Sequence, residues 1–143
     1  MDIALPPLHP LIVHAAVVLL PLTALGAIVV LLSSRARERY GSLLAVVALV
    51  AVASTFAARF SGEALAGTTT GMGTLGAHMF WGLIAPWPAA ALAVTLIGFL
   101  WASRGNRRAL RLTLGILTAL AALASLAVVV ITGHLGATAV WIG

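Results

Sequence analysis

The chain has 143 residues, of which 62% are hydrophobic and 8% are charged, and its formal net charge is +5. A soluble globule of this composition would have too little polar surface to present to water, so the composition predicts a membrane protein. The sequence contains no cysteine, which excludes a covalently attached c-type haem, an iron–sulfur cluster, a thiolate zinc site and a disulfide.

Four apolar stretches are long enough to cross a hydrocarbon core of about 30 Å, which takes roughly 20 helical residues. They run about 11–32, 43–60, 78–102 and 112–133. The alternating pattern of a membrane barrel is absent, and backbone polar groups in lipid must be satisfied within their own segment, so we expect helices. The sequence therefore predicts an all-α membrane protein, in which residues 1–143 form a single domain with four transmembrane helices in an up-down bundle.

The first segment places two histidines near one end of the first helix. It is preceded by Asp2 and by no basic residue, and its length of about 22 apolar residues exceeds a signal-peptide core, so we expect a helix that is not cleaved. Pro10 suits a first helical turn, which puts His9 at the helix mouth and His14 about 6 Å deeper, at 1.5 Å per residue. An imidazole inside a membrane is costly without a partner, so His14 is the stronger ligand candidate of the two.

Most of the positive charge lies in the two short loops 33–42 and 103–111, which hold Arg35, Arg37, Arg39, Arg104, Arg107, Arg108 and Arg111. Short arginine-rich loops stay in the cytoplasm, which predicts a multi-pass protein of the cytoplasmic (inner) membrane with both termini outside. Topology and contact with anionic membrane lipids explain the charge, so we expect no nucleic-acid partner.

Two further charged residues stand at the outward end of the second segment. Arg59 and Glu63 are four residues apart, a spacing at which an ion pair forms on a helix. The alternatives are that Arg59 faces a haem propionate and that Glu63 is a metal ligand or a proton acceptor. The loop that follows, 61–77, is rich in Gly and Thr and is a candidate lid.

His78 opens the third segment and His134 closes the fourth, so all four histidines fall at the outward ends of the predicted helices. Three of the four helices contribute an imidazole at similar depth, and convergence from separate helices is how a ligand site in a bundle core is built. We therefore expect a cofactor in the outer leaflet, bound by His14, His78 and His134, with His9 and Arg59 also among the binding residues.

The run Leu8-His9-Pro10 followed by Val13-His14 resembles the opening of a bacterial membrane-protein family, that of domain of unknown function 2231. The Gly62-Glu63 step, the single His78 before the third helix and the Gly133–Gly136 ending are similar as well, while Gly136-Ala137 replaces the family's usual Gly-Gly. The resemblance implies four membrane helices in a layout like that of small b-type cytochromes. It also implies electron transfer, since some relatives are joined to redox modules such as Rieske domains.

Together these features favour a membrane-bound b-type haem protein that carries electrons near the outer face and is not a catalyst. The first and third helices of an up-down bundle are diagonal neighbours, so His14 and His78 can hold the iron of haem b from opposite sides. His134 is then a substitute ligand or a donor that fixes a ligand's tautomer. We expect a redox partner protein at the outer face, and a homo-oligomer or a larger complex is compatible with these residues.

Two alternatives stay open. In the first, His14, His78, His134 and Glu63 hold a zinc or copper ion in an outward-facing cavity, where zinc with an open position would permit hydrolysis. In the second, the chain is a cofactor-free subunit of a larger membrane complex, and its histidines are hydrogen-bonded interface residues. An absorption spectrum together with metal analysis would separate the three interpretations.

Overall fold

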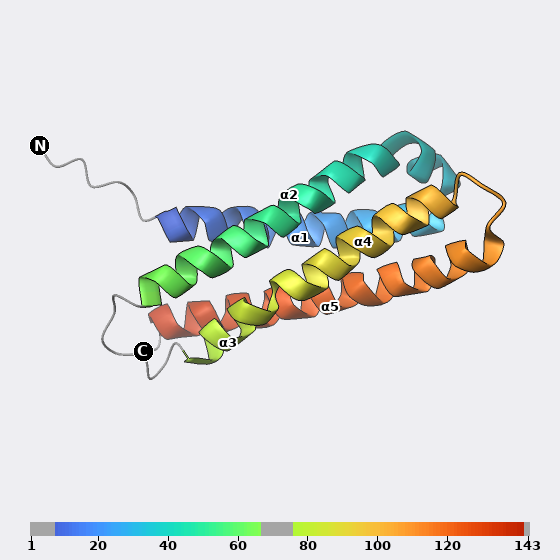
Figure 1. Cartoon of the computed structure of the whole chain (residues 1–143). Helices are drawn as coiled ribbons and strands as arrows, with labels where there is room; N and C mark the ends of the chain where they lie inside the picture. Colours follow the sequence, from blue (N-terminus) through green and yellow to red (C-terminus); the bar gives the residue numbers. More distant parts are fainter. Residues whose placement is uncertain (1–7, 67–75, 142–143) are drawn as a thin grey trace, which may run out of the picture.

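The structure is a computed structural model that describes residues 8–66 and 76–141, almost all of which are helical (Figure 1). Its helices are α1 (Leu8–Leu32), α2 (Ser34–Ala66), α3 (Gly76–Ile84), α4 (Pro86–Ala102) and α5 (Arg108–Trp141). Four helical stretches are long and apolar enough to cross a membrane, namely His9–Leu32, Ser34–Ala64, Gly76–Ala102 and Arg108–Thr138. The predicted all-α membrane fold with four spanning helices in an up-down bundle is confirmed.

The predicted loop 33–42 is almost entirely helical, and the predicted loop 103–111 is helical from Arg108 onward. α2 begins at Ser34 and not at about 43, and α5 begins at Arg108 and not at about 112. Hydropathy marks only the part of a helix that lies in hydrocarbon, whereas arginine is a good helix former and continues the helix beyond it. Only Ser33 separates α1 from α2, and its hydroxyl accepts a hydrogen bond from the backbone N–H of Ala36 at 3.2 Å, as an N-cap does.

The predicted lid is also shorter than the sequence suggested. α2 continues through Ala66 and α3 starts at Gly76, so residues 67–75 are what is left of the predicted loop 61–77. These residues lie outside the described part of the chain, and the lid stays a prediction.

The third spanning segment is interrupted at Ala85, directly before Pro86. Proline has no backbone N–H to donate and its ring crowds the preceding turn, so a helix ends or bends there. The nine-residue α3 consequently packs against α5 and α2 as well as against α4. This places the start of α3, with His78, at the end of the bundle where α1 begins and α5 ends (Figure 1).

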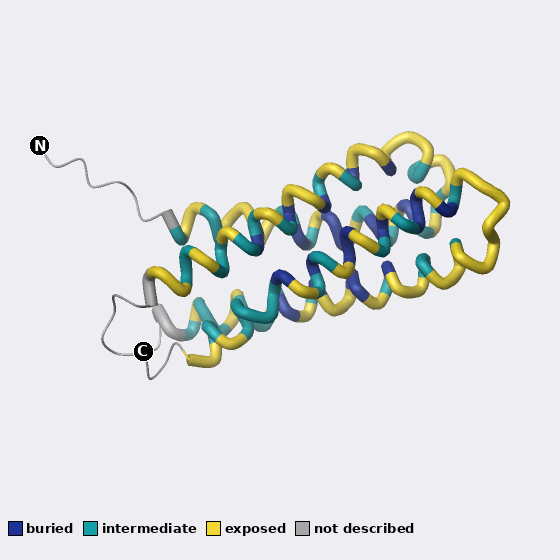
Figure 2. Tube along the Cα trace, in the orientation of Figure 1, coloured by how far each residue is buried: buried dark blue, intermediate teal, exposed yellow. Residues whose placement is uncertain are grey.

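The long helices pack in the cyclic order α1, α2, α4, α5, so α1 lies diagonally opposite α4. The core cluster of this bundle combines larger apolar side chains with alanines, of which each long helix contributes two: Ala24, Ala27, Ala48, Ala51, Ala89, Ala93, Ala121 and Ala122. Alanine lets helix backbones approach closely, which replaces the hydrophobic drive that lipid cannot supply. The buried positions run along the inside of the bundle (Figure 2), and every long helix also carries exposed large aliphatic side chains.

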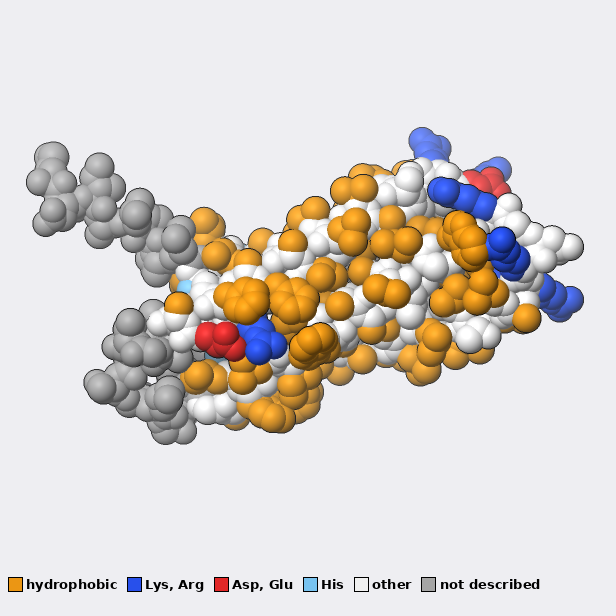
Figure 3. All heavy atoms as spheres, viewed as in Figure 1, with side chains coloured by type: hydrophobic (Ala, Val, Ile, Leu, Met, Phe, Trp, Pro, Cys, Tyr) orange, Lys and Arg blue, Asp and Glu red, His pale blue; other side chains and the backbone are white. Residues whose placement is uncertain are grey.

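The two ends of the bundle differ in chemistry. Arginine side chains gather at the end where α2 and α5 begin, and the flank between the two ends is largely apolar (Figure 3). All four histidines belong to the other end, because they lie near the start of α1, the start of α3 and the end of α5. The bundle therefore separates a cationic end from an imidazole-bearing end.

The alanine packing predicts a sharp size limit in the middle of α2. Ala51→Leu should destabilise the folded protein by about 1–3 kcal/mol, because Ala51 is fully buried and overpacking a filled core forces the helices apart. Ala53→Leu is the matched control, since Ala53 is exposed on the same helix. Thermal unfolding of both variants in the same detergent measures the effect, and equal stabilities would contradict the packing described here.

Candidate functional site

His9 is held by α2 through one ring nitrogen and one glycine. Its Nδ1 lies 2.8 Å from Ser61 Oγ, and that hydroxyl donates its own proton to the Ala58 carbonyl at 3.0 Å. The serine oxygen must therefore accept from His9, so Nδ1 carries the proton in the neutral ring and Nε2 keeps its lone pair. A Cβ on Gly62 would lie 3.1 Å from His9 Cε1, so the imidazole rests directly on the backbone of this glycine.

His78 is held by α5 in the same manner. Its Nδ1 lies 2.9 Å from the carbonyl oxygen of Thr132, which can only accept, so Nδ1 is again the protonated nitrogen. A Cβ on Gly136 would stand 3.0 Å from both Nδ1 and Cε1 of this ring. Both half-buried imidazoles thus have Nδ1 anchored to a neighbouring helix and a glycine against the ring, and in the neutral form of each ring the lone pair is on Nε2.

His9 and His78 come from opposite sides of the imidazole-bearing end of the bundle, which we call the bundle mouth. His9 opens α1, and His78 opens α3, which packs against α5 and α2. Anchoring Nδ1–H to an oxygen acceptor fixes the orientation of a histidine and raises the basicity of its other nitrogen, which is how proteins prepare histidine as a metal ligand.

The other two histidines are exposed, so the structure does not assemble His14, His78 and His134 into one site. His14 Nδ1 lies 2.6 Å from the carbonyl oxygen of Pro10, so this ring bonds to the preceding turn of its own helix. The sequence predicted the depth of His14 but not its direction around the helix. The buried face of α1 follows Ala16, Leu20, Thr23, Ala27 and Val30, and the same spacing continued backwards reaches 13 and 9 but not 14.

Arg59 and Glu63 form the ion pair that their spacing predicts, with Arg59 Nε 3.2 Å from Glu63 Oε1. Arg59 Nη1 also donates to the Leu83 carbonyl at 3.4 Å and so joins α2 to α3. Both side chains keep access to solvent, at 26% and 42% exposure. The Glu63 carboxylate is thus engaged by Arg59, and among the described residues no three histidines or carboxylates converge on a metal-sized site.

Comparison with known proteins identifies the family. Over residues 5–143 the sequence matches the family model described as "Predicted membrane protein (DUF2231)". The chain belongs to this family. The resemblance seen in the Leu8-His9-Pro10 opening is confirmed, and the match spans all four histidines together with Gly62 and Gly136. No curated protein and no solved structure matches the chain.

Sequence reasoning missed the acceptors that anchor the two rings, Ser61 and the Thr132 carbonyl. A backbone carbonyl leaves no mark in a sequence, and Ser61 is one of several serines and threonines in the chain. The available signal was glycine, because Gly62 and Gly136 stood out in the family resemblance. Their role as seats for imidazole rings becomes visible only when the helices are placed side by side.

The contact between Gly136 and the His78 ring can be tested by comparing substitutions at Gly136 and at Gly133, one helical turn away. A Cβ at Gly133 meets nothing within 4 Å, whereas a Cβ at Gly136 meets the His78 ring at 3.0 Å. Both exchanges to alanine carry the same gain in helix propensity. Gly136→Ala should therefore be less stable than Gly133→Ala by about 1 kcal/mol, the net value of the His78 hydrogen bond that it strains. Thermal unfolding measures the difference, and two variants of equal stability would show that the ring does not rest on Gly136.

Proposed function

We propose that this protein is a b-type haem protein of the cytoplasmic membrane that transfers electrons, and that His9 and His78 would hold the haem. The observation that supports it is the pair of imidazoles at one bundle mouth, each anchored through Nδ1 and each left with a basic Nε2. The proposal replaces His14 with His9 in the ligand pair, because His9 lies on the inward face of α1 and His14 is exposed.

The number of available ligands favours haem over a bare metal ion. A porphyrin supplies four nitrogens, so two histidines complete the iron's coordination, whereas a zinc site needs three or four protein ligands. In the part of the chain that the structure describes, no group of three such side chains is present. The zinc or copper alternative therefore has less support than the haem interpretation.

Each residue of the site has a distinct part in the proposal. Bound haem would supply a reversible one-electron change, and His9 and His78 would hold it. Ser61 Oγ and the Thr132 carbonyl orient the two rings and make Nε2 more basic. Arg59 is paired with Glu63 and donates to the Leu83 carbonyl, so its part is to join α2 to α3 at the same end of the bundle.

The orientation in the membrane is part of the same proposal. Seven arginines at one end favour its retention in the cytoplasm, which sets the histidine end and both termini outside. Electrons would then be exchanged with a redox partner protein at the outer face. A haem there would lie close to that surface and not at the middle of the bilayer.

The proposal predicts that haem binding depends on His9 and His78 and not on His14 or His134. Protein produced with ample haem should show a Soret band, and haem per chain should fall to a small fraction in His9→Ala and in His78→Ala. His14→Ala and His134→Ala are the matched controls and should keep most of the haem, since both residues are exposed. Ser61→Ala should weaken haem binding by about 10-fold or more through loss of the anchored nitrogen.

Haem content, the absorption spectrum and metal analysis of the same samples decide the outcome. A colourless wild-type protein under full haem supply would reject the proposal. Stoichiometric zinc or copper in such a sample would favour the metal alternative. Neither cofactor would favour the cofactor-free subunit.

Topology can be tested directly, because the natural sequence contains no cysteine. A single cysteine in place of Thr69 should react with a membrane-impermeant maleimide in intact cells, since α2 ends and α3 begins at the histidine end. A cysteine in place of Asn106, between α4 and α5, should react only after the cells are opened. The reverse labelling pattern would refute the proposed orientation.

A further inference from the structure

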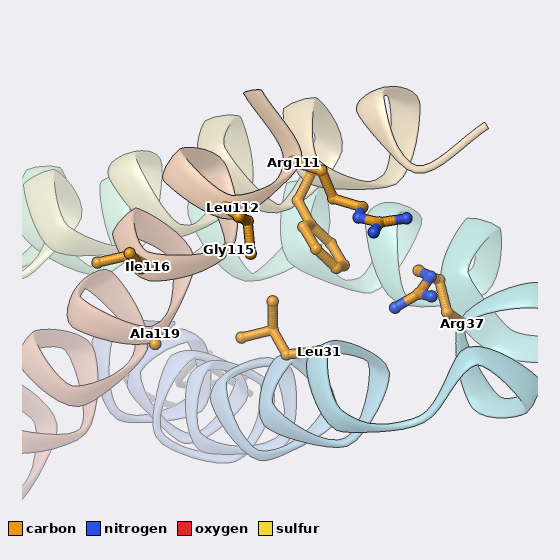
Figure 4. Close-up of a pocket in the computed structure, with 8 residues that line it drawn as sticks. Leu31, Arg37, Arg111, Leu112, Gly115, Ile116 and Ala119 are labelled. Carbon is orange, nitrogen blue, oxygen red and sulfur yellow. The ribbon is translucent and has the colours of Figure 1, made fainter. Parts of the chain in front are cut away.

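A second site lies at the arginine end, far along the bundle from the histidines. A pocket of about 450 Å³ opens there, within the range of roughly 300–1,000 Å³ that is usual for ligand sites. α1, α2, α4 and α5 all contribute to its lining, which consists of Leu31, Arg37, Phe99, Arg111, Leu112, Gly115, Ile116 and Ala119 (Figure 4).

The pocket has a cationic end formed by two arginines from different helices. The guanidinium groups of Arg37 and Arg111 lie at the same end and point toward one another (Figure 4). Arg37 is held in place, because its Nη1 donates to the Val30 carbonyl at 3.0 Å and its guanidinium lies 5.3 Å from the centre of the Phe99 ring. The positive charge of Arg37 is therefore held by contacts with α1 and α4, and Arg111 adds a second positive charge from α5.

These arginines have no carboxylate to neutralise them among the described side chains. The sequence contains three acidic residues, and only Glu38 lies at this end, beside seven arginines. The ion pair found in the described part of the chain joins Arg59 to Glu63, at the opposite end. Two facing guanidiniums attract an oxyanion that can accept hydrogen bonds from both, as a phosphate does.

The rest of the pocket is apolar and open to the surroundings of the bundle. Leu112 and Ile116 are 55% and 62% exposed, and they continue along α5 away from the arginines toward Ala119 (Figure 4). Gly115 forms part of the floor, since a Cβ there would lie 3.5 Å from Leu31 and from Phe99. An occupant of this groove would have an anionic head at the arginines and a hydrocarbon chain that runs toward the middle of the membrane.

We propose that this pocket is a specific binding site for an anionic phospholipid, with its phosphate between Arg37 and Arg111 and one acyl chain along Leu31 and Ile116. Charge complementarity selects the anionic head, and the apolar groove distinguishes a lipid from free phosphate. The site is independent of any cofactor, because it lies at the other end of the bundle.

Native mass spectrometry of the full chain can test the site, with phosphatidylglycerol and phosphatidylcholine as the probes. Wild-type protein should retain one phosphatidylglycerol in preference to phosphatidylcholine. Arg111→Gln should weaken that binding by at least about tenfold, the usual effect of losing one hydrogen bond to a charged group. Arg108→Gln removes the same charge from an exposed position on the same helix turn and should change binding little.

A second variant separates the groove from the charge. Gly115→Leu keeps every arginine but fills the groove beside Leu31 and Phe99, so it should also release the lipid. Equal retention of both lipids, or equal losses in Arg111→Gln and Arg108→Gln, would overturn the proposal in favour of diffuse surface charge. Inorganic phosphate that displaces the lipid at equal concentration would overturn the role of the acyl chain. The helical circular dichroism of each variant verifies that it is folded.

Discussion

The close contact of alanines at the centre of the bundle is the constraint on which both ends depend. Lipid gives helices no hydrophobic reason to associate, so small residues that let backbones approach supply the packing. That packing fixes the rotation of each helix about its own axis. The rotation of α1 turns His9 inward and leaves His14 exposed, and the approach of α5 brings the Gly136 backbone beneath His78.

The sequence was sufficient to predict the fold but not to predict where the helices begin and end. A membrane span needs about 20 apolar residues and cannot contain unpaired backbone groups. The four spans could therefore be predicted from the lengths of the apolar stretches. No such demand acts outside the hydrocarbon, where Arg35 and Arg108 extend helices that hydropathy had ended. For the site, the positions of the histidines along the four predicted helices indicated that all of them share one end of the bundle. Which of them face one another depends on inter-helix contacts, and His14 shows that depth alone does not determine this.

The separation of chemistry along the bundle axis explains how one small domain can offer two sites. At one end, two imidazoles are anchored to a hydroxyl and a carbonyl oxygen. At the other, arginines outnumber acidic residues seven to one and two of them face a shared groove. The length of the bundle separates these ends, and charges exposed to water more than about 10 Å apart are largely screened by salt.

The single-residue link at Ser33 makes α1 and α2 a hairpin, and α5 forms a second hairpin with α3 and α4. Each hairpin anchors its own histidine, His9 on Ser61 and His78 on Thr132. Neither half contains both imidazoles, so the pair exists only after the hairpins have docked. Any group bound to both rings would act as a cross-link between the halves and would slow their dissociation, which couples occupancy of the site to the mechanical integrity of the bundle.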